Sequence, residues 1–257
     1  MRIARVEVHG EAHDAILEGD IAYHLEGSVF HAPHKGAAIG PVSELKLLAP
    51  CTPTKVVCIG LNYKAHIEET NATAPTEPLM FFKPPTSVVG HLDDVHWIPG
   101  CEKLDYESEL AMVFGKTAKN IAPGTYRDYV LGYTCANDIS ARDFQRSDGQ
   151  WTRAKGSDTF CPLGPWIVTD INAEDLHIGG ALNGEVRQDS RTSDLLFGLD
   201  ELVVHVTKYF TMLPGDVMIT GTPSGVGTSK GLMKPGDVYE VTIEGIGTLR
   251  NRIVGLH

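Results

Sequence analysis

The chain has 257 residues, enough for one large domain or for a domain with a small appendage, and 42% of them are hydrophobic. Its net charge of −11 excludes nucleic acid as an expected partner, because neutralising phosphates requires a basic surface. No basic amphipathic stretch or membrane-spanning apolar run is present, so no membrane partner is expected either. Five scattered cysteines without a C-x-x-C pair, and a start unlike a signal peptide, predict reduced thiols in a cytoplasmic protein.

Residues 1–50 are predicted to form a small N-terminal β domain, or an N-terminal part of the same sheet system, ahead of a main domain at 51–257. Short alternating stretches separated by glycine turns predict strands at 3–9, 15–17, 21–25 and 29–31. No cluster of chemically active residues appears in this part.

A short buried strand at 55–60 leads into a predicted helical turn at 61–69. His66 and Glu69 lie three residues apart, so on a helix they share a face and can form a hydrogen bond. A histidine held by a carboxylate is a natural water-activating base. An exposed helix with ordinary charges explains this segment equally well. Another apolar strand, 79–85, ends at a double proline, and its Lys83 either reaches the site or simply caps the strand.

The segment 104–114 predicts a strand on which Glu107 and Glu109 point the same way, roughly 6–7 Å apart at Cα. The apolar residues that follow suggest that both carboxylates are at least half buried. Buried carboxylates must be paired, protonated or bound to a metal. The alternative is that both side chains face solvent on an edge strand.

A second apolar strand at 129–136 places Asp138 at its exit, where a carboxylate can point into a site. Arg142 and Gln145 follow at helical spacing. The stretch 150–166 is predicted to be an ordered loop, and 86–103 is also loop-like. One long helix is expected within 195–212, and Asn183-Gly184 predicts a hairpin turn. Later strands are predicted at 166–169, 178–182, 217–220, 238–243 and 248–254.

The segment 221–227, Gly-Thr-Pro-Ser-Gly-Val-Gly, predicts a tight loop. It matches neither a P-loop nor a dinucleotide-binding fingerprint. Its glycines allow backbone N–H groups to approach an anion closely, although a plain surface turn is an equal alternative.

Five motifs in this order closely resemble the fumarylacetoacetate hydrolase family, and the resemblance covers about residues 52–257. They are Gly-Leu-Asn-Tyr-Lys-Ala-His at 60–66, Asp-Tyr-Glu-Ser-Glu-Leu at 105–110, Asn-Asp-Ile-Ser-Ala-Arg-Asp at 137–143, Lys-Gly-Ser-Asp-Thr-Phe-Cys-Pro-Leu-Gly-Pro at 155–165 and the run from Leu213 to Gly227. The resemblance implies a mainly β (α+β) fold, a mixed β-sandwich roll with few helices. It also implies a catalytic domain at 51–257 and a homodimer.

The resemblance implies that Glu107, Glu109 and Asp138 bind one divalent cation, Mg²⁺ or Mn²⁺. Three carboxylates without cysteine or histidine favour such a hard ion. It further implies that His66 and Glu69 activate water, on a segment that in relatives often acts as a lid. The residues that it assigns to the substrate or to its developing negative charge are Arg142, Gln145, Lys155 and Thr222.

These roles predict an enzyme for a small anionic 2-oxo acid. Hydrolysis of the C–C bond of an acylpyruvate is the first expectation, because both members of the His/Glu pair are present. Decarboxylation of an oxaloacetate-like acid, or isomerisation of an unsaturated 2-oxo diacid in aromatic catabolism, is the close alternative. A non-catalytic protein that only binds a 2-oxo acid is a remote one, because pure binding needs no base. The distal part of the substrate is expected to contact residues 67–78 and 86–103.

Overall fold

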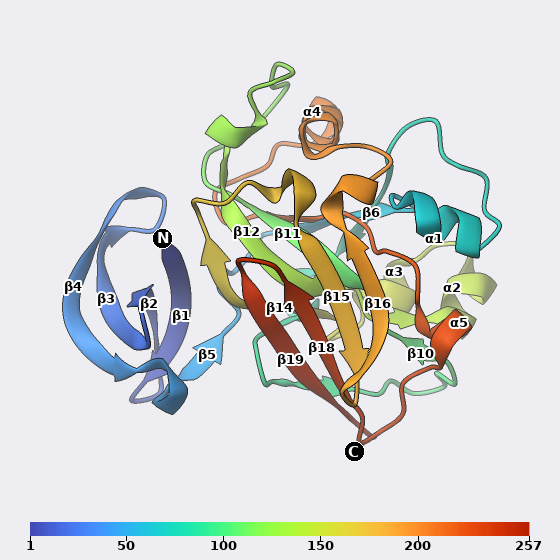
Figure 1. Cartoon of the computed structure of the whole chain (residues 1–257), viewed down its shortest axis with the longest axis horizontal. Coiled ribbons are helices and arrows are strands. Elements are labelled where there is room, and N and C mark those ends of the chain that lie inside the picture. The colour runs from blue at the N-terminus through green and yellow to red at the C-terminus, as the bar shows by residue number, and fades with distance from the viewer. Residues whose placement is uncertain (257) are drawn as a thin grey trace.

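The computed structural model describes residues 1–256. Strands dominate it, and they gather in one large sheet, one five-stranded sheet and one small pair (Figure 1). The large sheet runs in the order β4-β3-β2-β1-β14-β12-β11-β17-β6-β7, and two further strands, β5 and β8, pair with β1 and β14. The five-stranded sheet has the order β16-β15-β18-β19-β9. The mainly β, mixed-sheet prediction is confirmed.

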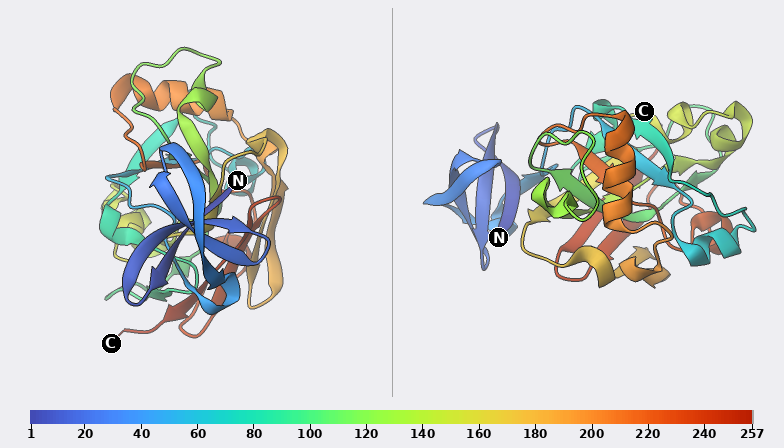
Figure 2. Two further views of the ribbon diagram at one scale, coloured as in Figure 1. Left: turned by 90° about the vertical axis from the view of Figure 1, so that its left-hand side faces the viewer. Right: turned by 90° about the horizontal axis from the view of Figure 1, so that it is seen from above.

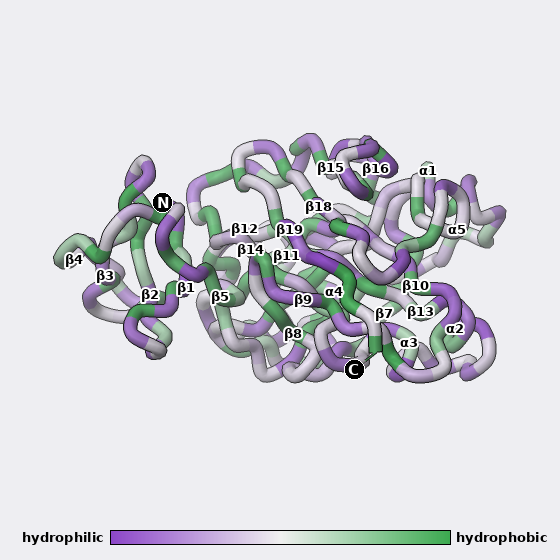
Figure 3. The backbone as a smooth tube through the Cα atoms, turned by 90° about the horizontal axis from the view of Figure 1, so that it is seen from below, coloured by the Kyte–Doolittle hydropathy of each residue, from purple (hydrophilic) through white to green (hydrophobic). Residues whose placement is uncertain are grey.

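The N-terminal strands form a lobe at one end of the molecule (Figures 1 and 2). They are β1 (Arg2–Val8), β2 (Glu11–Glu18), β3 (Ile21–Ser28), β4 (His31–Pro41) and β5 (Lys46–Leu48). The predicted strand at 29–31 is wrong: Val29 and Phe30 form the turn before β4. Because β1 pairs with β14 through Arg2 and Ile3, the lobe continues the large sheet. Hydrophilic and hydrophobic residues are mixed along these strands (Figure 3), and a small hydrophobic cluster that includes Ala4, Val6, Ala15 and Leu17 lies within the lobe. The domain boundary at residue 50 stays a prediction.

The rest of the large sheet packs against the five-stranded sheet, and the main hydrophobic core lies between the two. The large sheet contributes β6 (Val56–Gly60), β7 (Leu79–Lys83), β8 (Val88–Val89), β11 (Ser108–Phe114), β12 (Val130–Asn137), β14 (Cys161–Val168) and β17 (Val217–Ile219). The five-stranded sheet consists of β9 (Asp94–His96), β15 (His177–Leu182), β16 (Glu185–Arg191), β18 (Val238–Ile243) and β19 (Gly247–Val254).

The side chains of β11 alternate between two hydrophobic clusters, as the period-two pattern predicts. Leu110, Met112 and Phe114 belong to the main core, whereas Ala111 and Val113 belong to the cluster on the other face. The strand predicted over 104–114 is interrupted, however. It divides into β10 (Leu104–Asp105), which pairs with β13 (Ser140–Ala141), and β11. The two residues between them leave the ladder.

Within residues 1–256, five α-helices lie at the edges of the sheets: α1 (Lys64–Glu69), α2 (Arg142–Asp148), α3 (Thr152–Gly156), α4 (Leu199–Tyr209) and α5 (Gly227–Lys230). Helix α4 confirms the long helix expected within 195–212, with Leu202, Val203 and Val206 fully buried. The ordered loop predicted at 150–166 contains α3 and the start of β14, so that prediction is wrong in part. The hairpin turn at Asn183-Gly184 is confirmed, and both residues have positive φ.

Candidate metal and active site

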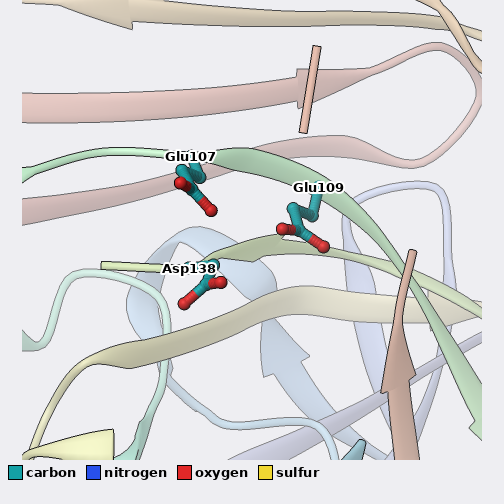
Figure 4. A group of neighbouring side chains, drawn as sticks. All are labelled: Glu107, Glu109 and Asp138. Carbon is teal, nitrogen blue, oxygen red and sulfur yellow. The ribbon is translucent and has the colours of Figure 1, made fainter. Parts of the chain in front are cut away.

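The carboxylates of Glu107, Glu109 and Asp138 converge on one buried point, where their oxygens lie within 4.8 Å of one another (Figure 4). Their residues are only 1–5% exposed. Strand β11 lies between β12 and β17, which excludes the alternative of a solvent-facing edge strand. Backbone pairing explains the meeting: the N–H of Asp138 donates to the carbonyl of Glu107 at 2.9 Å, so the exit of β12 lies beside the start of β11.

Each of the three carboxylates has one oxygen held by a donor of the protein, at 2.6–2.7 Å. These donors are Arg142 Nη2 on Glu107 Oε1, the Gly221 N–H on Glu109 Oε2, and Lys83 Nζ on Asp138 Oδ1. Lys155 Nζ contacts the second oxygens of Glu107 and Asp138, both at 2.7 Å. Positive charge from Lys155 therefore lies at the centre between Glu107 and Asp138, whereas Glu109 is held at Oε2 by a backbone N–H.

Burial and charge set the protonation of this group. Burial raises the pKa of Glu107, but the positive charges of Lys155 and Arg142 outweigh it and hold that pKa below its ordinary value. Burial and the negative charges of Asp138 and Glu107 raise the pKa of Glu109 well above its ordinary value. Burial lowers the pKa of Lys155, but its two carboxylate partners raise it above the ordinary value, so it stays an ammonium.

This donor set fits a hard divalent cation. The three buried carboxylates offer oxygen ligands only, which Mg²⁺ and Mn²⁺ prefer. The raised pKa of Glu109 also shows that its anionic form lacks sufficient positive charge nearby. A divalent cation among the three oxygens supplies that charge.

Lys83 is buried against this centre, with 1% of the residue exposed. Besides Asp138 Oδ1, its ammonium contacts the backbone carbonyl oxygens of Lys155, Phe160 at 2.7 Å and Ile139 at 3.4 Å. One lysine from β7 thus ties together the exit of β12 and the end of α3, the two segments that carry Asp138 and Lys155. Of the two alternatives for Lys83, reaching the site or capping a strand, the structure therefore favours the first.

His66 and Glu69 share a face of α1, as their spacing predicts. His66 Nδ1 lies 3.4 Å from Glu69 Oε2, and His66 is 7% exposed. Both oxygens of Glu69 accept from the N–H of Gly225, at 3.0 and 3.1 Å. The loop 221–227 therefore fixes the carboxylate that orients the histidine.

The N–H groups of this loop do approach anions, and those anions are carboxylates of the protein itself. Gly221 donates to Glu109, Gly225 to Glu69, and Gly227 to Asp105 at 2.6 Å. Gly225 has φ +96°, and a Cβ there would lie 2.0 Å from the carbonyl oxygen of Arg187, so only glycine fits. Of the two alternatives for this loop, the structure excludes the plain surface turn.

Asp105 is a site residue that the sequence analysis misses. It is fully buried, and its Oδ2 accepts from Arg142 Nε at 2.7 Å. Arg142 in turn donates to Gln145 Oε1 at 2.9 Å. The signal was present, since Asp105 is the first residue of the motif at 105–110, but a buried aspartate that holds an arginine cannot be told from a turn residue by sequence.

All nine predicted site residues line one cavity of about 530 Å³. They are His66, Glu69, Glu107, Glu109, Asp138, Arg142, Gln145, Lys155 and Thr222. The hydroxyl of Thr222 donates to the carbonyl of Ser108 and accepts from Gln188, so its grip on a substrate stays a prediction. From the expected distal segments, Thr70 and Ala72 line the cavity, whereas no residue of 86–103 does.

Comparison with protein families shows which family the chain belongs to. The model of the fumarylacetoacetate (FAA) hydrolase C-terminal domain matches residues 55–254. The chain belongs to this family. A second model, the Rv2993c-like N-terminal domain, matches residues 1–50.

Relatives of the family cover nearly the whole chain. Protein Rv2993c of Mycobacterium tuberculosis is 40% identical over 99% of this chain and 98% of its own length. The mitochondrial oxaloacetate tautomerase FAHD2A of Homo sapiens is 43% identical over 83% of this chain and 71% of its own length. The crystal structure of 2-hydroxyhepta-2,4-diene-1,7-dioate isomerase from Mycobacterium marinum superposes with a TM-score of 0.91, at 40% identity, covering 99% of this chain and 98% of that one.

The family is one of enzymes, and its members near this chain include isomerases and tautomerases. The buried acidic site belongs to the part of the chain that the family model covers. Among residues 1–256, no helix is both long and apolar enough to cross a membrane.

Proposed function

We propose that this protein is a divalent-metal-dependent enzyme that hydrolyses the C–C bond of acylpyruvate-type 1,3-dicarbonyls. The observation that carries the proposal is that the buried acidic triad and the His66–Glu69 pair line the same cavity. The proposed cation site and the proposed water-activating base therefore border the same cavity, in which the substrate would bind. The positively charged side chains that line this cavity, Arg142, Arg146 and Lys155, suit a small anionic 2-oxo acid.

In this proposal Glu107, Glu109 and Asp138 hold Mg²⁺ or Mn²⁺. When bound, the ion supplies a Lewis acid that polarises the 2-oxo-acid end of the substrate and stabilises enolate charge. Lys155 adds a fixed positive charge at the same point, because its ammonium already lies between two of the carboxylates. Arg142, Gln145 and Thr222 orient the substrate from the cavity wall.

His66 acts as the base in this scheme. Glu69 holds its Nδ1 edge, which leaves Nε2 to take a proton from water. The water oxygen bonds to the distal carbonyl carbon, and the C–C bond between that carbon and the pyruvyl methylene breaks. The electron pair of that bond becomes the pyruvate enolate. The enolate then takes up a proton, giving pyruvate and a carboxylic acid.

A second candidate uses the same enolate without attack by water: tautomerisation, isomerisation or decarboxylation of a 2-oxo diacid. The names of the relatives favour it, since they include an oxaloacetate tautomerase and a dioate isomerase. A protein that only binds a 2-oxo acid is disfavoured, because binding needs no histidine positioned by a carboxylate.

The test is turnover by chelator-treated protein to which Mg²⁺ or Mn²⁺ is returned. Pyruvate release from acetylpyruvate that depends on the ion supports hydrolysis. Metal-dependent consumption of oxaloacetate or of an unsaturated 2-oxo diacid, with no release from acetylpyruvate, refutes hydrolysis in favour of the second candidate. Absence of any turnover contradicts both and restores the binding protein.

The variant His66→Ala separates the reactions. It should abolish hydrolysis and spare a reaction that needs no water. His177→Ala is the matched control, because His177 also pairs with a carboxylate, Asp189, at 2.7 Å but does not line the cavity. Hydrolysis that survives His66→Ala undiminished excludes the assigned base.

The homodimer also belongs to this proposal. Light scattering coupled to size exclusion measures it directly. A mass of two chains is expected, and an active monomer would refute it.

A further inference from the structure

The cavity is lined by three side chains that carry a permanent positive charge: Arg142, Arg146 and Lys155. Two of these positive charges are already paired with carboxylates of the protein. Lys155 contacts two triad carboxylates, and Arg142 forms ion pairs with Asp105 and Glu107 at 2.7 Å each. Within residues 1–256, Arg146 forms no ion pair. It is therefore the one permanent cation of the cavity whose charge no protein anion neutralises.

Arg146 lies about one helical turn beyond Arg142, the arginine that contacts the triad. It follows Arg142 by four residues on α2, so both share a helix face, and Arg146 lies roughly 6 Å further along the axis. Arg142 touches the triad at Glu107, which is 5% exposed, whereas Arg146 is an exposed residue. The guanidinium of Arg146 thus lies toward the solvent end of the cavity.

The wall of the cavity also includes apolar side chains, and besides these three arginine and lysine residues its basic residues include only His66. Phe81 and Trp151 contribute rings whose centroids lie 5.2 Å apart, and Ile59 lines the same cavity. A ligand that fills the cavity thus contacts the triad, these apolar side chains and Arg146. A 2-oxo monoacid has no second carboxylate to pair with Arg146.

We propose that Arg146 binds the distal carboxylate of a dicarboxylic 2-oxo acid and makes the site selective for diacids over monoacids of equal length. The inference rests on the proposed 2-oxo-acid site but not on which reaction follows. Its physical basis is that a carboxylate approaching an exposed, unpaired guanidinium forms a charge-assisted hydrogen bond without breaking an existing ion pair. Arg142 and Lys155 offer no such free charge.

The experiment measures binding, so that it does not depend on turnover. The metal-loaded protein is titrated calorimetrically with 2-oxoglutarate and with 2-oxopentanoate, which have the same carbon chain and differ in the distal carboxylate. We expect the wild-type protein to bind the diacid about tenfold more tightly, the size of one charge-assisted hydrogen bond at a partly exposed site. In Arg146→Gln the two dissociation constants should converge, with that of the monoacid unchanged.

Arg153→Gln is the matched control. Arg153 is an exposed arginine on the neighbouring helix α3, but it pairs with Asp148 at 2.6 Å and does not line the cavity. This variant should keep the wild-type preference, and Arg146→Lys should keep most of it because the charge remains. Equal affinities in the wild type, or a preference that survives Arg146→Gln, overturn the inference. If neither acid binds, the proposed function fails, and the assignment of Arg146 fails with it.

Discussion

Replacing Lys83 by methionine tests whether this buried ammonium stabilises the acidic site. Methionine has nearly the same length and no charge, so it keeps the packing and removes only the ammonium. The change strips Asp138 Oδ1 of its 2.6 Å partner and leaves three backbone carbonyls without their shared donor. Breaking a buried ion pair from one side costs about 3–5 kcal/mol. For a chain of this size, that lowers Tm by roughly 6–20 °C.

The same variant should respond more strongly to a divalent cation than the wild type does. Without the ammonium, the triad carries one more uncompensated negative charge, and a cation bound there meets less repulsion. Tighter binding to the folded state produces a larger rise in Tm. The assay is thermal unfolding of chelator-treated protein with and without added Mg²⁺, compared as the increment in Tm.

Lys55→Met is the control for this experiment. Lys55 also pairs with a fully buried aspartate, Asp216, but this aspartate has further donors in Thr54 and Leu213 and is not one of the triad. We expect a smaller loss of Tm and an unchanged increment with Mg²⁺. An increment in Lys83→Met equal to or below that of the wild type would refute the assigned role of Lys83.

Three other predictions concern the charges of the fold. Glu107→Gln should abolish activity while circular dichroism stays native, and full activity would exclude the triad as a cation site. Because the pKa of Glu109 is raised, a cation that binds there displaces a proton. The metal affinity measured by calorimetry should therefore weaken by up to about tenfold for each pH unit below that pKa. An affinity that does not change with pH would contradict this. Burial raises the pKa of Asp216, but hydrogen bonds from Lys55 and Thr54 outweigh it and hold that pKa below its ordinary value. The ionised carboxylate therefore stabilises the fold at pH values above the ordinary pKa, and this stabilisation is lost as the pH falls through the lowered pKa. The stability difference between wild type and Asp216→Asn should therefore shrink in acid, and a constant difference would show that the charge of Asp216 is irrelevant.

From the residues alone, the sequence predicted proximity only for pairs whose spacing is local. Glu107 and Glu109 are two residues apart, so an extended backbone aims them together, and His66 and Glu69 are three apart on a helix. That Asp138 lies beside the two glutamates could not be predicted from local spacing, and it followed from the family motifs. The sandwich arrangement likewise came from the resemblance, since strand patterns alone do not determine which sheets face each other.

The groups that support these side chains were not predictable, because their partners are distant in the chain and some leave no trace in the side-chain sequence. The donor to Glu109 is the backbone N–H of Gly221, 112 residues away, and any non-proline residue has such a donor. Lys83 looks like the exposed end of a strand. The interruption of the strand at residues 106–107 was not predicted either, because the sequence pattern of a strand continues across it.

These distant donors explain how a strand-rich core tolerates three adjacent carboxylates, and they also limit how the carboxylates act. Arg142, Gly221 and Lys83 each hold one oxygen, and Lys155 contacts the other oxygen of Glu107 and of Asp138. A carboxylate that offers one ligand atom to a cation can therefore keep a protein partner on its other oxygen. If Mg²⁺ binds here as proposed, three single carboxylate oxygens would leave part of its octahedral shell open, as the proposed binding of a 2-oxo acid requires.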